Sequence, residues 1–111
     1  RGDREQWVAC FAQDGRWSSH IFDPTGHDAL REVWDGLWKD WDSVAFLGEI
    51  GAMEIEGDKA SVRSYAREVV KMKNGVIFKL CGHYDDKLVR SGGAWKFQWR
   101  HYKVVIEEFP S

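Results

Sequence analysis

Four long stretches with a two-residue hydrophobic period fill the second half of the chain, and they limit its fold more than any other feature. They are residues 44–56, 59–73, 76–90 and 95–108. Turn sequences typical of β-hairpins separate them, at Gly57-Asp58, Asn74-Gly75 and Ser91-Gly92-Gly93. Each stretch is longer than an average strand, and long hairpin-linked strands must twist and curl to remain paired. The pattern therefore predicts a strongly curved antiparallel sheet.

The first half of the chain has a helical period instead. Residues 4–12 predict the end of one helix, and residues 16–22 predict a short strand. A capping box from Thr25 to Asp28 predicts the start of a second helix. The apolar stripe of that helix comprises Leu30, Val33, Trp34, Leu37, Trp38 and Trp41. The predicted class is α+β, with helices packed on the concave face of the sheet around a cone-shaped apolar pocket.

Length and charge exclude several classes of protein. The 111 residues are enough for one hydrophobic core, so we expect a single domain over residues 1–111. Sixteen basic against eighteen acidic residues give a net charge of -2, which does not favour nucleic acid as a partner. No apolar run reaches the roughly 18 residues that span a bilayer, so we expect a cytoplasmic protein without membrane contact. No zinc-ligand spacing occurs, and we expect no metal.

The N-terminus is expected to be incomplete. The chain begins at Arg1 without a methionine, and its first predicted helix is too short to be stable alone. We therefore expect further helical residues upstream of Arg1.

Several motifs resemble the SnoaL-like domains of the nuclear transport factor 2-like superfamily. The most specific motif runs from Gly82 to Arg90 and continues through Gly93, Trp95 and Phe97 to Arg100. It is similar to the pattern G-x-Y-x-D-x-L-x-R followed by G-x-W-x-F-x-x-R. Residues 11–15, 26–30 and 55–60 carry further similarity. The resemblance implies a cystatin-like fold, which is the cone predicted above.

The resemblance implies more than one function, because the superfamily includes dehydratases, dehydrochlorinases, isomerases, polyketide cyclases and dioxygenase small subunits. The first hypothesis is a lyase or isomerase that needs no cofactor and transfers a proton on a small hydrophobic cyclic substrate. The alternative is a ligand-binding or dimerisation domain that has lost the catalytic base. A third hypothesis is an assembly role like that of a dioxygenase small subunit.

Tyr84 and Arg100 are the candidate catalytic residues. By resemblance the Arg100 side of its strand faces the pocket, where a guanidinium could stabilise a developing anion or could simply pair with Glu68. The Tyr84 phenol could donate a hydrogen bond to a carbonyl oxygen, or could be part of the core. The other candidate ligand-binding residues are Trp17, Ser19, Leu37, Trp38, Trp41, Phe46, Ala66, Glu68 and Tyr102. Together they imply a flat hydrophobic ligand.

The chain departs from the catalytic members at the positions of their bases. In dehydrochlorinase-like relatives a histidine base occupies the position of Phe46, and its aspartate partner would fall just before Arg1. The isomerase-like base position falls near Ser19. Among the histidines, His20 lies nearest the predicted pocket mouth, but Ser19 shares the face of Trp17, so a surface role is favoured for His20. His27, His83 and His101 are expected outside the pocket.

A strict alternation along the last strand places Trp95, Phe97 and Trp99 on its outer face. Three aligned rings would form an apolar patch that must be covered. We expect a homodimer through the back of the sheet, with a cover by Phe109 and Pro110 as the alternative.

Overall fold

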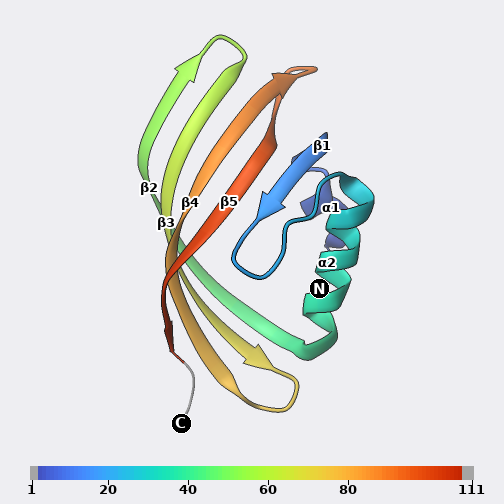
Figure 1. The fold of residues 1–111 in the computed structure, drawn as a ribbon, viewed down its shortest axis with the longest axis vertical. Coiled ribbons are helices and arrows are strands. Elements are labelled where there is room, and N and C mark those ends of the chain that lie inside the picture. The colour runs from blue at the N-terminus through green and yellow to red at the C-terminus, as the bar shows by residue number, and fades with distance from the viewer. Residues whose placement is uncertain (1–2, 109–111) are drawn as a thin grey trace.

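The computed structural model describes residues 3–108, which form two helices and one five-stranded sheet (Figure 1). The elements are α1 (Arg4–Val8), β1 (Phe11–Ser18), α2 (His27–Asp40), β2 (Trp41–Glu56), β3 (Lys59–Met72), β4 (Ile77–Ser91) and β5 (Ala94–Glu108). The strand order is β1-β5-β4-β3-β2. Strands β2 to β5 pair antiparallel, whereas β1 pairs parallel with β5. The predicted α+β class is confirmed.

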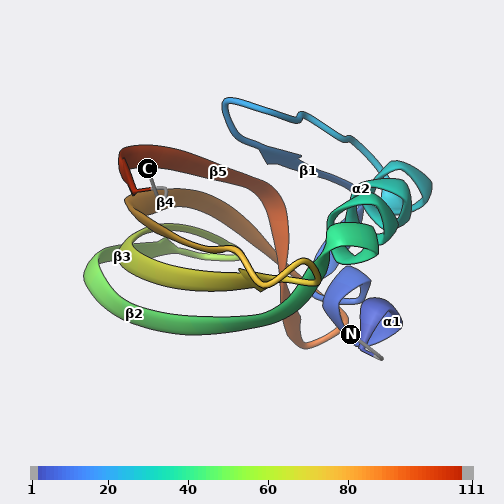
Figure 2. The ribbon, with the colours of Figure 1, turned by 90° about the horizontal axis from the view of Figure 1, so that it is seen from below.

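The sheet is strongly curved, and both helices and β1 lie on its concave side (Figures 1 and 2). Register shifts interrupt the long strands, and each shift leaves one extra residue on one strand. The extra residues are Asp42 and Gly51 on β2, and Gln98 and Val105 on β5. Such bulges bend a strand and increase its twist. Within residues 3–108, no helix has the length and apolar character needed to cross a membrane.

The first strand begins earlier than the sequence pattern predicts. Helix α1 ends at Val8, and Phe11 already pairs with Phe97, whose backbone N–H donates to the carbonyl oxygen of Cys10 at 2.8 Å. The predicted helix over residues 4–12 and the predicted strand over residues 16–22 are therefore wrong at their boundaries. Pairing with β5 supplies sheet hydrogen bonds that outweigh a weak local helical period.

The start of α2 also differs from the prediction. The helix begins at His27, with Gly26 at the N-cap and no side-chain capping hydrogen bond. The predicted capping box from Thr25 is therefore absent. Thr25 instead forms a β-bridge with Arg16, which closes the segment between β1 and α2 into a hairpin-like loop.

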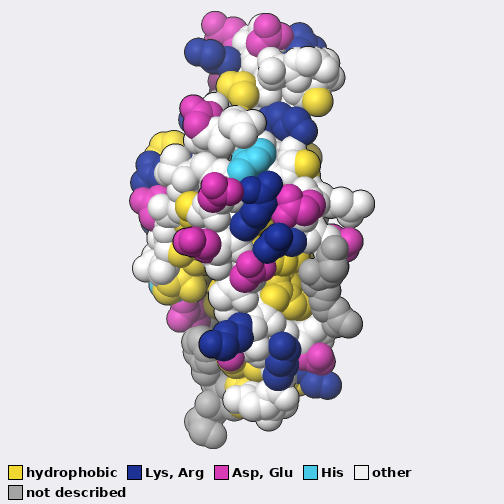
Figure 3. All heavy atoms as spheres, turned by 90° about the vertical axis from the view of Figure 1, so that its right-hand side faces the viewer, with side chains coloured by type: hydrophobic (Ala, Val, Ile, Leu, Met, Phe, Trp, Pro, Cys, Tyr) yellow, Lys and Arg dark blue, Asp and Glu magenta, His cyan; other side chains and the backbone are white. Residues whose placement is uncertain are grey.

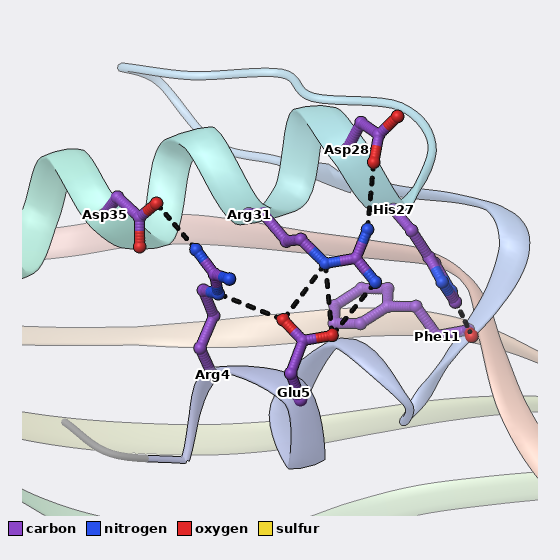
Figure 4. A network of polar contacts seen from close by, with 7 residues as sticks. All are labelled: Arg4, Glu5, Phe11, His27, Asp28, Arg31 and Asp35. Atoms are coloured by element: carbon purple, nitrogen blue, oxygen red, sulfur yellow. Dashed lines mark hydrogen bonds and ion pairs between the residues drawn. The ribbon is translucent and has the colours of Figure 1, made fainter.

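The two helices and β1 share a small core. Val8, Phe11 and Leu30 are buried there, and Trp7, Trp17 and Phe97 pack against them. Around it an ionic network joins the helices: Arg4 pairs with Asp35, and Arg31 pairs with Glu5 (Figure 4). Acidic and basic side chains also intermix on the helical side of the surface (Figure 3). Exposed pairs of this kind add little stability, so the apolar contacts hold the helices in place.

The bulge at Gln98 changes which face of β5 each aromatic ring occupies. Phe97 pairs with Leu88 and Arg100 with Asp86, so Phe97 and Arg100 share the concave face. Trp95 pairs with Arg90 and lies on that face too. The prediction that Trp95 and Phe97 face outward is therefore wrong, and of the three rings Trp99 alone lies on the convex face. Phe109 and Pro110 lie outside the described residues.

Candidate functional site

A cavity of about 430 Å³ is enclosed by the concave face of the sheet, by helix α2 and by the loop that follows β1. Most of its wall is apolar. The lining residues are Trp17, Ser19, His20, Ile21, Phe22, Leu37, Trp41, Glu68, Met72, Phe78, Leu80, Tyr84, Tyr102, Val104 and Glu107. A cavity of this size and character suits a small apolar ligand. Its few ionisable groups are therefore the candidates for chemistry.

The structure brings most of the predicted site residues to this cavity. Those that line it are Trp17, Ser19, Leu37, Trp41, Glu68, Tyr84 and Tyr102. They come from β1 and the loop that follows it, α2, and strands β2 to β5, so the pocket depends on the complete fold rather than on one local motif.

Four predicted residues lie outside the lining. Ala66 is buried in a cluster with Tyr84 and Tyr102. Phe46 is 52% exposed, with its ring centre 6.5 Å from that of Tyr84. Trp38 lies at a separate surface depression beside Trp41, because it is one residue further round the helix than Leu37, which lines the cavity.

Arg100 is the fourth of these residues and lies beside Tyr84 on the concave face, outside the cavity lining. Its guanidinium carbon is 3.8 Å from the ring centre of Tyr84 and 4.6 Å from that of Phe97. Its Nε is 3.4 Å from Oδ1 of the buried Asp86, and the two atoms have no hydrogen-bond partner among the described residues. Burial raises the pKa of Asp86 to about 6, although Arg100 opposes this shift. Arg100 is placed to support Tyr84 rather than to contact a ligand directly.

Glu68 and Tyr84 form the polar centre of the pocket wall. The Tyr84 hydroxyl donates to Glu68 Oε1 at 3.1 Å. Burial raises the pKa of Glu68, and this effect outweighs the opposing hydrogen bond from Tyr84 and the charge of Arg100. Burial also raises the pKa of Tyr84 and of Tyr102, whose rings stack with centres 4.6 Å apart. Both phenols therefore remain protonated donors, while the Glu68 carboxyl holds its proton more tightly than an ordinary glutamate does.

Sequence reasoning missed part of the pocket, and two causes explain this. The loop residues His20, Ile21 and Phe22 reach the cavity because the backbone turns back after Ser19, whose N–H donates to the carbonyl oxygen of Phe22 at 2.8 Å. The bulge at Val105 turns Glu107 to the concave face, opposite Leu80. The alternation of Phe78 and Leu80 with Tyr84 along β4 was a usable signal for these two residues.

His20 lies at the pocket mouth, where its Nε2 is 2.9 Å from Glu107 Oε1. The surface role favoured for His20 describes only part of its position. Its side chain is 51% exposed, but it also lines the cavity. The other histidines lie outside the cavity: His27 contacts the Phe11 carbonyl oxygen, His83 lies beside Asp85, and His101 contacts Ser18. Within residues 3–108, no group of His, Cys, Asp and Glu is arranged to hold a metal ion.

Solved structures with the same fold include enzymes of several kinds. A protein of Novosphingobium aromaticivorans described as a scytalone dehydratase has 23% identity and a TM-score of 0.88 over 97% of this chain and 74% of its own. A hexachlorocyclohexane dehydrochlorinase of Novosphingobium barchaimii has 16% identity and a TM-score of 0.83, over 99% and 78%. A ketosteroid isomerase-like protein of Erwinia carotovora has 22% identity and a TM-score of 0.85, over 96% and 84%. At these identities the likeness shows the fold.

A search of curated protein sequences gave no match. The description of the SnoaL-like domain, by contrast, matches residues 1–101, which is most of the chain. Together with the curved sheet and its covered concave face, this match assigns the fold to the nuclear transport factor 2-like superfamily. The chain belongs to the SnoaL-like domain family.

Proposed function

We propose that this domain binds a small, flat, apolar molecule in its pocket and transfers a proton on it, as a lyase or isomerase that needs no cofactor. Glu68 is the proton-transfer group, and Tyr84 orients the Glu68 carboxyl. The Arg100 guanidinium packs on the ring of Tyr84 and stabilises its position. In this proposal the base is not at the position of Phe46 on β2. It is at Glu68, the residue on β3 that pairs with Phe46.

The observation that carries the proposal is the carboxyl group of Glu68 in a mostly apolar wall. Burial raises its pKa, so its carboxylate is a stronger base than one in water. The Tyr84 hydroxyl at 3.1 Å fixes its orientation. Two residues that line the pocket also carry unpaired polar atoms, since Trp17 Nε1 and the Tyr102 hydroxyl are buried without a hydrogen-bond partner among the described residues. A ligand oxygen that reached either donor would satisfy it.

Phe46 favours a second candidate, a binding domain without catalysis. A phenyl ring cannot accept a proton, and it replaces the histidine expected by resemblance at this position. In that case the pocket would hold an apolar ligand, and Glu68 would be a hydrogen-bonded wall residue. The two functions share the binding step and differ in turnover, so the experiments separate them.

Binding is tested with N-phenyl-1-naphthylamine, a neutral fluorescent naphthalene that becomes brighter in apolar surroundings. We expect saturable binding to the unmodified protein. Leu37→Trp should fill the cavity and weaken binding at least about tenfold, since it places a large ring where the probe would lie. The matched control is Leu47→Trp, on an exposed position of β2, which should bind as the unmodified protein does. Equal binding by the two variants would contradict a ligand site in this pocket.

Turnover is tested with 5-nitro-1,2-benzisoxazole, whose ring opens when a base removes its carbon-bound proton. We expect Glu68→Gln to lower the rate at least about tenfold without loss of naphthylamine binding, because an amide cannot accept the proton. Glu49→Gln, on an exposed position of β2, is the matched control. If the unmodified protein binds the naphthalene probe and yet opens the benzisoxazole no faster than Glu68→Gln does, that result would support the binding domain instead.

The homodimer through the sheet back remains a proposal as well. Leu47, Tyr65, Trp99 and Ile106 are exposed on the convex face, where they could pack against a second copy. Sedimentation equilibrium should show a dimer that Ile106→Glu converts to a monomer. A monomeric unmodified protein would contradict this interface.

A further inference from the structure

The loop between β1 and α2 holds a histidine at the mouth of the pocket by several contacts. The Trp17 N–H donates to the carbonyl oxygen of Pro24 at 3.0 Å, and the rings of Trp17 and Phe22 lie 4.3 Å apart. Arg16 binds both carboxylate oxygens of Asp23, at 2.6 and 2.7 Å. His20 lies at the tip of this braced turn. Its position over the cavity is therefore set by the loop rather than left to solvent.

The partner of His20 comes from the far end of the chain. Without the bulge at Val105, strand alternation would turn Glu107 to the convex face. With the bulge, Glu107 pairs with Leu80 and lines the cavity, and its Oε1 lies 2.9 Å from His20 Nε2. A carboxylate at this distance can accept a hydrogen bond from the Nε2–H group and so fixes the ring orientation. The second ring nitrogen, Nδ1, is then the one available to a ligand.

From this geometry we infer that His20, oriented by Glu107, is the general acid of the pocket. The inference rests on the proposed function, because it supplies the second half of the proton transfer that Glu68 begins. Glu68 removes a proton from carbon, and the C–H electron pair forms a new π bond. The bond from the adjacent atom to the leaving oxygen breaks, and that oxygen takes the proton of the His20 imidazolium. The imidazole then regains a proton from water, and Glu68 returns its proton to water.

The other ionisable groups of the cavity do not fill this role. Facing His20, the lining contains Glu68 on β3, Tyr84 on β4, and Tyr102 and Glu107 on β5, while α2 contributes the apolar Leu37. Burial raises the pKa of both phenols, which makes them poor proton donors compared with an imidazolium. The substrate class that fits is a neutral ring compound with an acidic C–H and an oxygen on which negative charge develops.

Two benzisoxazoles test the inference, because they differ in their need for an acid. Opening of 5-nitro-1,2-benzisoxazole releases a stabilised nitrophenolate, whereas 1,2-benzisoxazole without the nitro group releases a more basic phenolate that gains more from protonation. We expect His20→Gln to lower the rate with the unsubstituted compound at least about tenfold and the rate with the nitro compound less than about threefold. Glu107→Gln should show the same selectivity to a smaller degree. His83→Gln, on the convex face, should change neither rate.

The outcomes separate this inference from the proposed function. Equal losses on the two compounds in His20→Gln would indicate a structural role and would overturn the general acid, as would no loss on either. A selective loss in His20→Gln together with a loss on both compounds in Glu68→Gln supports both assignments. If Glu68→Gln alone reduces turnover, the proposed function stands and the inference about His20 fails. No turnover by the unmodified protein overturns both. Thermal unfolding of each variant checks that this half-exposed turn residue has not altered the fold.

Discussion

Asp85 and Asp86 are neighbours in the chain, but they lie on opposite faces of β4 and behave in opposite ways. Asp85, on the convex face, forms an ion pair with Arg63, and this partner lowers its pKa. Asp86, on the concave face, is 4% exposed and also has an arginine beside it, yet burial raises its pKa to about 6. An arginine partner is therefore not what decides the shift. Desolvation dominates on the concave face, and pairing dominates on the convex face.

The same contrast explains why chemistry is expected on one face only. Glu68 resembles Asp86, because it is half-buried on the same concave face and burial raises its pKa too. On the convex face, Asp85 is instead paired with Arg63, and this pairing lowers the pKa of Asp85. Only the concave face combines apolar walls with groups whose proton affinity has changed.

The largest expected effect tests packing with another pair of neighbours on β4. Phe78 is 8% exposed and Ile77 is 47% exposed. We expect Phe78→Ala to lower the free energy of unfolding by about 3 kcal/mol or more, since it deletes a buried ring. Ile77→Ala should cost less than about 1 kcal/mol. Urea denaturation measures both values, and similar costs would contradict the assignment of one buried and one solvated face.

The next effect concerns the pH dependence of stability. The pKa of Asp86 is raised from 3.8 to about 6 on folding, so the native state binds the proton more tightly than the unfolded state. Stability from this group is complete below pH 3.8 and declines as the pH rises toward 6, by about 3 kcal/mol in all. We expect Asp86→Asn to remove this decline. Unfolding curves between those pH values measure it, and an unchanged slope would contradict a buried, raised Asp86.

Asp85→Asn should change the slope in the opposite sense. The lowered pKa of Asp85 contributes stability above its unfolded pKa, and this stability is lost as the pH falls. Because Asp85 and Arg63 are both more than 40% exposed, we expect the contribution to be less than about 1 kcal/mol. Unfolding curves recorded over a range of pH values measure this contribution. If Asp85→Asn rather than Asp86→Asn removed the decline with rising pH, the contrast between the faces would be reversed.

The last prediction concerns two tyrosines. Tyr84→Phe removes the hydrogen bond to Glu68, so we expect a loss of about 1 kcal/mol in stability. The pKa of Glu68 should also rise further, because that bond lowers it now. NMR titration of the Glu68 carboxyl carbon measures this change. Tyr65→Phe, at a position that is 52% exposed, should change stability by less than about 0.5 kcal/mol and leave Glu68 unaffected.

Strand positions were predictable because the turns carry local signals. Gly57 and Gly75 adopt positive φ angles of 62° and 90°, which other residues rarely adopt. The strands on either side of these turns begin and end within a residue or two of the predicted positions. The start of β1 was not predictable in this way. Its residues pair with β5, more than 80 positions away, and no local pattern records a partner at that distance.

The sequence by itself determined the α+β class, the four long strands with their turns, and the family. It also identified much of the pocket lining, including Tyr84 and Glu68. The tertiary structure alone decided which face Phe97 and Glu107 occupy. A single extra residue at Gln98 or Val105 reverses the alternation of every position beyond it until the next bulge. Whether a residue is extra depends on how it pairs with the neighbouring strand, and that pairing is fixed only when the sheet curls around its core.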